Sequence, residues 1–467
     1  MKSPAGTGRD RDGDRVTATL TVEADTPEAA VAALDFIEPG WTVTALPAQR
    51  PEHQQLLIEV ADERQLHRLC HAASRHRRVI AYTDRLWRMS AGGRITTRPR
   101  HPARTGDDLA LLTPPGTDRL AAAIASRPGT AADVTGRPNR VAVVSDGSAL
   151  PGLGRLGPLA ALPMLEGKAA LLAQLAGIDA VPLALDTDQP DRMVAAIRAV
   201  APTFGAVNLT GISAPACFDV ERRLRYALNI PVYHDEQHGT PVVVLAALRN
   251  ALRITGKQLS TARIVVMGAG VTGIAVTRLL LYAGAHDVTV WTRHGILGPH
   301  LAGLPAHTAW LAGSTNPRRL RGDLEQALTA ADAVIGLSAA GLLSPHLIAA
   351  MAAPPIVFAL ARPEPEIQPE DLAGSSAIIA TARREYPNHI SDLPAAPGTL
   401  RGLLNARASE VTAAALLAAA DVLGGLVGDE LLTPSRLLPE ALHPALVPTM
   451  SAAVAAVVSS HQPGRLA

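Results

Sequence analysis

The chain has 467 residues, enough for two or three domains, and 48% of them are hydrophobic, as in a folded globular protein. Lysine and arginine number 43 against 42 aspartate and glutamate residues, which excludes a basic field that would attract nucleic acid or an anionic membrane. The two cysteines, Cys70 and Cys217, form no CxxC motif, so we expect reduced thiols. The first twenty residues lack a signal peptide's apolar core, and Asp421 and paired glycines interrupt the apolar segment 411–430. We therefore expect a cytoplasmic protein without a membrane span.

Residues 15–90 have the pattern of a small separate domain. Alternating apolar residues predict strands at 15–24, 40–48, 53–61 and 78–84, and helices are predicted at 26–37 and 62–76. The resulting βαββαβ order is the ferredoxin-like pattern, at the usual size of an ACT-type domain that senses a small effector. A linker rich in proline and arginine, "RITTRPRHPARTGDD", follows it.

The rest of the chain predicts an α/β fold. Strands and helices alternate from 139 to about 235, a helix is expected at 239–255, and "RIVVMGAGVTGIAVTRLLLYAGAHDVTVW" reads as strand, glycine turn, helix and strand. Further strands are predicted at "ADAVIGLSA", "PIVFALA" and "AIIATA", and mostly helix follows.

Two segments match the GxGxxG pattern of dinucleotide-binding turns. Gly268, Gly270 and Gly273 directly follow a strand and open an apolar helix, which predicts a tight turn and a close approach to a pyrophosphate. The match at 152–157 is separated from its strand and follows a proline, so we interpret it as a loop at the site.

The second strand of the dinucleotide unit ends at Trp291, Thr292 and Arg293. An NAD enzyme usually places an acid here, where it bonds the ribose hydroxyls. With an arginine instead, NADP is at least as plausible a cofactor as NAD.

The longer motifs closely resemble bacterial malic enzymes, especially "VAVVSDGSALPGLGRLGPLAALPMLEGKAALLAQLAGIDAVPLALDT" and "PTFGAVNLTGISAPACFDVERRLRYALNIPVYHDEQHGTPVVVLAAL". "VMGAGVTGIAVTRLLLYAGAHDV", "PIVFALARPEPEI" and "YPNHISDLPAAPGTLRGLL" continue the similarity, which extends over residues 15–460 and includes the N-terminal unit found in actinobacterial members. The resemblance implies an ACT-like domain at 15–90, a malic-enzyme-like substrate domain at 100–237, a Rossmann NAD(P)-binding domain at 238–420 and C-terminal helices at 421–467. It also implies a homodimer.

Malic enzymes oxidise malate with NAD(P), decarboxylate the product with the help of a divalent cation and then protonate it. By resemblance, Lys168 in "EGKAALL" is the catalytic lysine, and we expect it to act as a base near neutral pH. Asp235 in "YHDEQHGT" matches a family acid that would tune this lysine.

Other positions of the family's site have changed. Thr113 stands where the resemblance places a tyrosine, and the positions of the three acidic metal ligands are Thr210, Gly211 and Glu236. One or two remaining carboxylates fall short of the oxygen ligands that Mg²⁺ or Mn²⁺ prefers, so we expect no bound divalent metal.

The substrate-binding asparagines of the family correspond to Arg362 and to the pair Ser391 and Asp392. Arg362 or Arg155 would then supply fixed positive charge to a substrate carboxylate, unless these side chains point to solvent or pair with nearby acids. His234 and His238 beside Asp235 would suit a Zn²⁺ site, but the resemblance favours a packing role.

Three functions remain open from the sequence. The favoured one is a divergent, metal-independent NAD(P)-dependent oxidoreductase that acts on a small carboxylate other than malate. The second is a pseudoenzyme that binds a nucleotide or effector for regulation. The third is a residual malic enzyme that converts malate to pyruvate and CO2.

Overall fold

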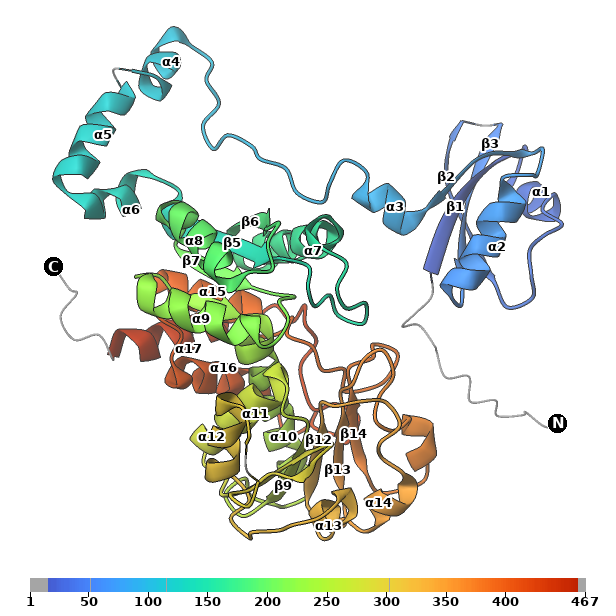
Figure 1. The fold of residues 1–467 in the computed structure, drawn as a ribbon. Helices are drawn as coiled ribbons and strands as arrows, with labels where there is room; N and C mark the ends of the chain where they lie inside the picture. Colours follow the sequence, from blue (N-terminus) through green and yellow to red (C-terminus); the bar gives the residue numbers. More distant parts are fainter. Residues whose placement is uncertain (1–15, 51, 115, 302, 461–467) are drawn as a thin grey trace. The chain divides into compact units, whose positions relative to one another are not determined.

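A computed structural model describes residues 16–50, 52–114, 116–301 and 303–460, and the chain divides into two compact units after Arg94. We call residues up to Arg94 unit 1 and the remainder unit 2 (Figure 1). Unit 1 ends within four residues of the predicted end of the N-terminal domain.

Unit 1 has the predicted βαββαβ order, followed by one more short helix. Its elements are β1 (Val16–Glu23), α1 (Pro27–Ala32), β2 (Thr42–Arg50), β3 (His53–Val60), α2 (Glu63–Ala73), β4 (Val79–Asp84) and α3 (Arg85–Ser90). The antiparallel sheet has the order β2-β3-β1-β4, which is the ferredoxin-like arrangement. Alternate residues of β1 and β3, such as Leu20 and Leu56, are fully buried against the helices.

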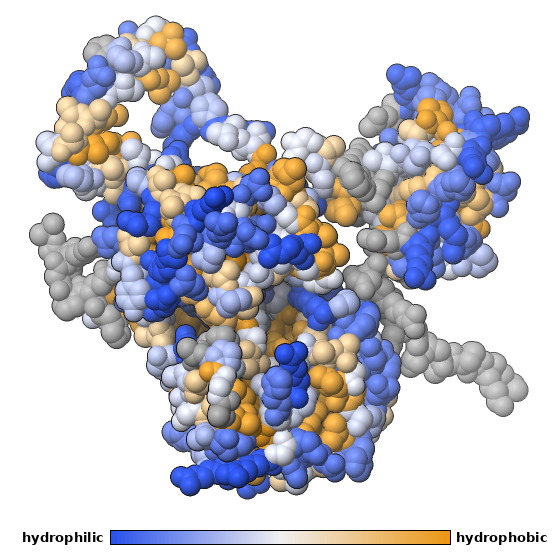
Figure 2. Space-filling view, viewed as in Figure 1, coloured by the Kyte–Doolittle hydropathy of each residue, from blue (hydrophilic) through white to orange (hydrophobic). Residues whose placement is uncertain are grey.

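Unit 2 begins with a helical arm made of α4 (Gly106–Leu112), α5 (Gly116–Ser126) and α6 (Ala131–Val134). A capping box between Thr105 and Asp108 starts α4. No residue of α4 or α5 is buried, and Leu111 is 69% exposed. Figure 2 shows apolar side chains on the surface of this arm.

The first sheet of unit 2 is parallel, with the order β6-β5-β7-β8. Its strands are β5 (Arg140–Ser145), β6 (Asp179–Ala184), β7 (Ala206–Leu209) and β8 (Val232–His234). The accompanying helices are α7 (Pro158–Ala176), α8 (Pro190–Val200), the short η3 (Ala201–Thr203) and α9 (Ala216–Ala227). Among the described helices, α7 alone has the length and composition that would allow a membrane crossing; here it packs against β5 and β6.

The second sheet has the order β11-β10-β9-β12-β13-β14 and is parallel except for β11. Its strands are β9 (Arg263–Met267), β10 (Asp287–Thr292), β11 (Gly295–Ile296), β12 (Ala333–Gly336), β13 (Ile356–Ala359) and β14 (Ile378–Thr381). The helices are α10 (Thr240–Ile254), α11 (Val271–Tyr282), α12 (Ala306–Ser314), α13 (Leu324–Leu328), α14 (Pro345–Ala349), α15 (Ala396–Asn405), α16 (Ala413–Gly425) and α17 (Leu446–Ser460). This is the expected doubly wound α/β domain.

The two sheets of unit 2 share one hydrophobic core. It extends from Val141 in β5 through α10 and β9 to Val454 in α17. Helix α10 joins the two halves because its residues are buried almost along its whole length. The predicted boundary at 420/421 is wrong, since it falls inside α16, a continuous helix that packs on α10 and α17.

Candidate active site

The glycine turn between β9 and α11 has the geometry that a dinucleotide needs. Gly268 has a φ of +110°, and a side chain there would approach the Leu337 carbonyl oxygen within 2.5 Å. A Cβ at Gly273 would lie 2.1 Å from the Gly268 carbonyl oxygen, so glycine is required where helix and turn meet. A Cβ at Gly270 would meet no atom within 4 Å, which leaves the N-terminus of α11 open to a phosphate.

The carboxyl end of β10 carries a cation where NAD enzymes usually carry an acid. Thr292 accepts a hydrogen bond from the backbone N–H of His294 at 3.2 Å, and this bond shapes the turn. Arg293 between them is exposed. Its Nε donates a hydrogen bond to His294 Nε2 at 3.2 Å, and its two terminal guanidinium nitrogens can reach a phosphate on the ribose.

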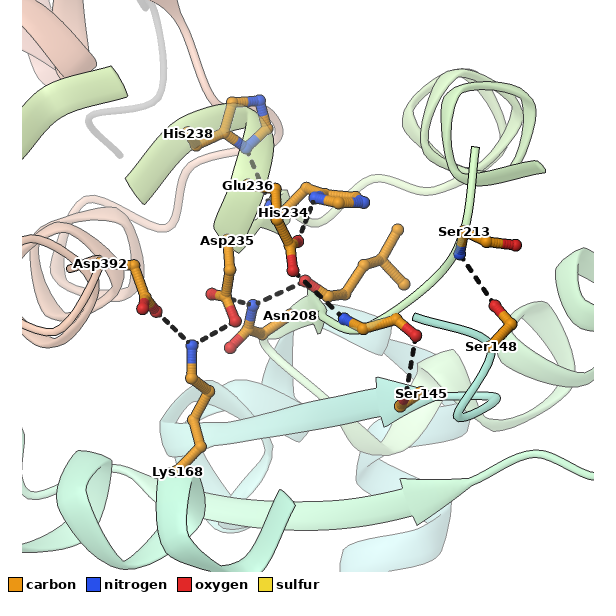
Figure 3. Close-up of polar contacts among 12 residues, drawn as sticks. Ser145, Ser148, Lys168, Asn208, Ser213, His234, Asp235, Glu236, His238 and Asp392 are labelled. Atoms are coloured by element: carbon orange, nitrogen blue, oxygen red, sulfur yellow. Dashed lines mark hydrogen bonds and ion pairs between the residues drawn. The ribbon is translucent and has the colours of Figure 1, made fainter. Parts of the chain in front are cut away.

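Three charged side chains from distant parts of unit 2 meet at Lys168 (Figure 3). Helix α7 carries Lys168, the helical turn η4 (Asp235–Gly239) begins with Asp235, and Asp392 precedes α15. The Lys168 ammonium donates hydrogen bonds to both carboxylates, and its Nζ lies 2.6 Å from Asp392 Oδ2. Asn208 at the end of β7 donates a hydrogen bond to the other Asp235 oxygen at 2.9 Å.

Burial and charge set the protonation of this group, which we call the Lys168 cluster (Lys168, Asp235 and Asp392). Burial opposes the charge on Lys168, but Asp235 and Asp392 outweigh it and raise the pKa of the lysine. Burial raises the pKa of Asp235 despite the nearby Lys168. The pKa of Asp392 is lowered: burial opposes this, but the charge of Lys168 wins. The sequence predicted that Lys168 acts as a base near neutral pH. In this arrangement Lys168 is instead an ammonium between two carboxylates.

Thr210, Gly211 and Glu236 stand where the resemblance places metal ligands, and Glu236 contacts protein groups here. Glu236 Oε1 accepts a long hydrogen bond of 3.4 Å from the backbone N–H of Gly211, and Glu236 Oε2 lies 3.1 Å from His234 Nδ1. Burial lowers the pKa of His234, but Cys217 and Glu236 more than offset it and raise that pKa to about 10. Glu236 is therefore paired with an imidazolium.

These residues do not fit a divalent cation. Thr210 and Gly211 bring no carboxylate, Glu236 is paired with His234, and Asp235 is paired with Lys168. Gly211 has a φ of +63°, which favours glycine. Over the described ranges of the chain, no group of three or more histidine, cysteine, aspartate or glutamate side chains is arranged to hold a metal ion.

His238 has a structural contact that explains its place beside the site. Its Nδ1 accepts a hydrogen bond of 2.9 Å from the backbone N–H of His234, and its ring packs on Tyr233. Burial lowers the pKa of His238 to about 3, so the ring is neutral.

Hydrogen bonds join two loops on the side of Asn208 away from Lys168 (Figure 3). The Ser148 hydroxyl donates a hydrogen bond to Asp146 Oδ1 at 2.7 Å and accepts one from the Ser213 backbone N–H at 2.8 Å. The Ala149 backbone N–H donates to the Gly211 carbonyl at 2.9 Å, which joins the carboxyl ends of β5 and β7. This is the edge of a parallel sheet at which ligands bind.

The predicted substrate residues divide into two groups. Arg362 is exposed at the end of β13, close enough that its charge helps to lower the pKa values of Asp392 and His389. Ser391 lines a cavity of about 650 Å³ next to Asp392. The structure thus brings Arg362 and Ser391 to the region of the Lys168 cluster.

Arg155 and Thr113 make other contacts. Arg155 is 59% exposed and forms an ion pair with Asp188 at 3.4 Å, and its contact with a substrate stays a prediction. The Thr113 hydroxyl donates to the Leu109 carbonyl at 2.7 Å at the end of α4, on the exposed arm. Within this chain it makes no described contact with the Lys168 cluster.

Sequence reasoning missed three residues that support the site. Asn208 orients Asp235, and the fully buried Tyr233 lies close enough that the charges of Asp235 and Asp392 add to burial in raising its pKa. Glu366 accepts hydrogen bonds from the backbone N–H groups of Ser338 and Ala361, both at 3.0 Å, and so holds the backbone directly before Arg362. Its signal was a glutamate seven residues after the end of the apolar strand β13.

Comparison with known proteins agrees with this architecture. Residues 129–225 match the family model "Malic enzyme, N-terminal domain", and residues 237–462 match "Malic enzyme, NAD binding domain". The chain is 40% identical to the NAD-dependent malic enzyme of Geobacillus stearothermophilus over 86% of this chain and 84% of that protein. It is 39% identical to the bifunctional malic/malolactic enzyme of Bacillus subtilis over 78% and 89% of the two chains.

Solved structures show the same fold. The NAD-dependent malic enzyme of Thermotoga maritima has a TM-score of 0.76 and 39% identity, over 80% of this chain and 99% of that one. The malic enzyme of Pyrococcus horikoshii has a TM-score of 0.76 and 37% identity, over 80% and 89%. With its two matched domains and a dinucleotide turn, this chain belongs to the malic enzyme family.

Proposed function

We propose that this chain is an NAD(P)-dependent oxidoreductase that interconverts a small 2-hydroxy carboxylate other than malate and its 2-oxo form without a divalent cation. One observation carries the proposal: the Lys168 ammonium, held by Asp235 and Asp392, is the charged centre of a site whose metal-ligand positions are Thr210, Gly211 and a paired Glu236.

The charge of the site favours a monocarboxylate. Lys168 and Arg362 supply two positive charges, Asp235 and Asp392 supply two negative charges, and the His234–Glu236 pair is neutral. A site without net charge binds a single carboxylate at Arg362 more easily than a dicarboxylate such as malate.

The Lys168 cluster provides a route for the hydroxyl proton. In the oxidation direction, the Lys168 ammonium passes one proton to Asp235, whose pKa burial raises, and the resulting amine takes the proton of the substrate hydroxyl. In the reverse direction the ammonium returns a proton to the 2-oxo oxygen. Asn208 and Asp392 orient the cluster during both steps.

The nicotinamide cofactor accepts or supplies the hydride at C2 when bound. The turn from Gly268 to Gly270 and the N-terminus of α11 fit its pyrophosphate, and Arg293 fits a 2′-phosphate. NADP is therefore the cofactor that we propose, with NAD as the alternative.

Malic enzyme activity is the second candidate. It is favoured by the 40% identity to a relative named NAD-dependent malic enzyme. Asp235 and Glu236 would then have to recruit a cation in spite of their pairing with Lys168 and His234.

One assay separates these candidates. NAD(P)H formation from a panel of 2-hydroxy acids that includes malate is measured with Mn²⁺ and with EDTA, and pyruvate is detected in parallel. We expect turnover of a monocarboxylate that survives EDTA and falls about 100-fold or more in Lys168→Ala. Arg223→Ala, which alters the ion pairs of Arg223 with Asp191 and Asp219, is the control and should leave the rate unchanged.

Robust pyruvate formation from malate that EDTA abolishes would refute the proposal and establish the second candidate. Nucleotide binding without turnover of any acid would also refute it, in favour of a regulatory protein.

A further inference from the structure

A second cavity lies on the other side of η4 from the Lys168 cluster. Its volume is about 430 Å³, which suits a small molecule. It is lined by side chains of α9, η4, α11, α12 and α16 together with Val411, and we call it the η4 pocket: Glu221, Arg225, Gln237, His238, Ile274, Ala275, Arg278, Leu279, Tyr282, Trp310, Val411, Ala413 and Leu416. In Figure 3, His238 lies on the side of η4 away from Lys168.

Two arginines give the η4 pocket an anion-binding end. The Arg278 guanidinium lies 5.2 Å from the centre of the Trp310 ring, and Arg225 lies over the ring of Tyr226 at 5.5 Å. Within the described part of the chain neither arginine has an ion pair, so the donors of both are available to a ligand.

One acid lines the η4 pocket together with these arginines. Glu221 is half-buried on α9 and has no ion-pair partner among the described residues, although Arg225 is one helical turn away. Burial raises the pKa of its carboxyl group, which Arg225 and Arg278 partly counteract. A ligand that placed a donor here would satisfy an acceptor that the protein leaves open.

Two more donors point to a polar ligand. Gln237 Nε2 is buried without a hydrogen-bond partner in the described structure, a state that typically costs about 1–3 kcal/mol. His238 accepts at Nδ1 from the His234 backbone, which leaves its Nε2 as an N–H donor. The remaining wall, formed by Ile274, Val411 and Leu416, is apolar.

We propose that the η4 pocket is a second small-molecule site that binds an α-amino or α-hydroxy acid with an apolar side chain. The carboxylate meets Arg225 and Arg278, the adjacent amino or hydroxyl group donates to Glu221, and the side chain packs on Val411 and Leu416. A carboxylate alone would leave Glu221 unsatisfied, and a dianion would be repelled by it.

Residues of the η4 pocket adjoin both the Lys168 cluster and the nucleotide turn. Gln237 and His238 directly follow Asp235 and Glu236 in the same five-residue turn, and Arg278 lies on α11, the helix that opens at the nucleotide turn. A ligand held here would bias the positions of η4 and α11, so we assign this ligand the role of an effector. This regulatory part rests on the proposed function; the binding itself does not.

Binding is tested directly on the full chain with three probes of the same shape. L-Leucine, 2-hydroxy-4-methylpentanoate and 4-methylpentanoate are compared by ligand-observed NMR and tryptophan fluorescence. We expect the first or second to bind and the third, which lacks the α-donor, to bind at least about tenfold more weakly.

Variants locate the site. Arg278→Gln and Glu221→Gln should each weaken binding at least about tenfold, and Ala413→Phe should abolish it by filling the cavity. Arg223→Gln is the matched control, because Arg223 lies on α9 but pairs with Asp191 and Asp219 outside the pocket. Circular dichroism confirms that each variant is folded.

No binding of the α-substituted acids, or binding that the pocket variants leave unchanged, would overturn the proposal. If the variants remove binding but the chain oxidises no acid, the η4 pocket is upheld and the proposed function alone fails.

Discussion

The ammonium of Lys168 lies 2.6 Å from a carboxylate oxygen of Asp392, a residue 224 positions later in the chain. This ion pair joins α7 of the first sheet to the segment before α15, and it crosses the region where the substrate is proposed to bind. The charge of Asp392 therefore acts directly on the protonation of Lys168.

Replacing that charge should move the pH dependence of catalysis. Asp392 raises the pKa of Lys168, so Asp392→Asn lowers it, and the amine that accepts the hydroxyl proton is then available at lower pH. The rising limb of kcat/KM for oxidation should shift to lower pH, as measured by NAD(P)H formation across a pH series. Asp188→Asn, which alters the exposed pair with Arg155, should leave the profile in place. An unchanged limb in Asp392→Asn would mean that another group accepts the proton.

The preference for NADP or NAD tests the role of Arg293 at the end of β10. We expect NADP to bind at least as tightly as NAD, because Arg293 is exposed there and the two residues before it, Trp291 and Thr292, carry no carboxylate. Arg293→Ser should weaken NADP binding about tenfold or more and leave NAD binding nearly unchanged. Titration calorimetry with both nucleotides measures this. A clear preference of the unaltered chain for NAD would show that the ribose contact comes from elsewhere.

The exposed helical arm of α4 and α5 predicts how the chain assembles. We propose a homodimer in which α4 and α5 are covered by a second copy, because neither helix buries a residue in the single chain and Leu111 and Leu112 are 69% and 57% exposed. Light scattering should give a dimer mass at micromolar concentration. The double variant Leu111→Glu with Leu112→Glu should shift it toward monomer, and Leu442→Glu, at an exposed leucine outside the arm, should not. A monomer mass for the unaltered chain contradicts the proposal.

Periodicity and turn chemistry predicted most of the fold. Most strands of both units and the glycine turn at Gly268 were found because each has a local signal: alternation, a buried apolar run or a GxGxxG motif. The short strands β8 and β11 were not predicted, because runs of three and two residues carry no such signal. The predicted domain boundary at 420/421 was wrong because it had no local signal. Helix α16 packs on α10 within one shared core, and the sequence pattern shows no break there.

The site was only half predictable. Lys168, Asp235 and Asp392 were named from resemblance, but the sequence does not show that one ammonium contacts both carboxylates, which reverses the expected protonation of the lysine. The sequence also does not show that Arg155 pairs with Asp188, which lies on a different loop. Long-range pairings of this kind are set by tertiary structure.

Unit 1 is expected to be a separable module. The chain divides after Arg94, and residues 95–104 form neither helix nor strand. We propose that unit 1 is an ACT-type domain that binds a small effector. A chain starting at residue 95 should stay soluble and melt in one cooperative transition by circular dichroism, while isolated unit 1 should fold on its own. An insoluble or molten truncated chain would show instead that unit 1 completes the core of unit 2.

The metal-ligand positions allow a test by restoration. The triple variant Thr210→Glu, Gly211→Asp and Glu236→Asp supplies three carboxylates at the positions where the resemblance places them, and it removes the glutamate that pairs with His234. Gly211 has a φ of +63°, so an aspartate there costs about 1–2 kcal/mol of backbone strain, and the Met164 methyl group, 3.0 Å from a Cβ, must move.

We expect calorimetry to show Mn²⁺ binding to the triple variant and much weaker binding, or none, to the unaltered chain. The double variant Thr210→Gln with Gly211→Asn is the control, because it has similar shapes without the charges. Any dehydrogenase activity of the unaltered chain should persist in EDTA, since the proposed proton route uses Lys168 and Asp235 alone. Tight, stoichiometric Mn²⁺ binding by the unaltered chain would contradict this, because it would require Glu236 and Asp235 to leave His234 and Lys168 for the cation.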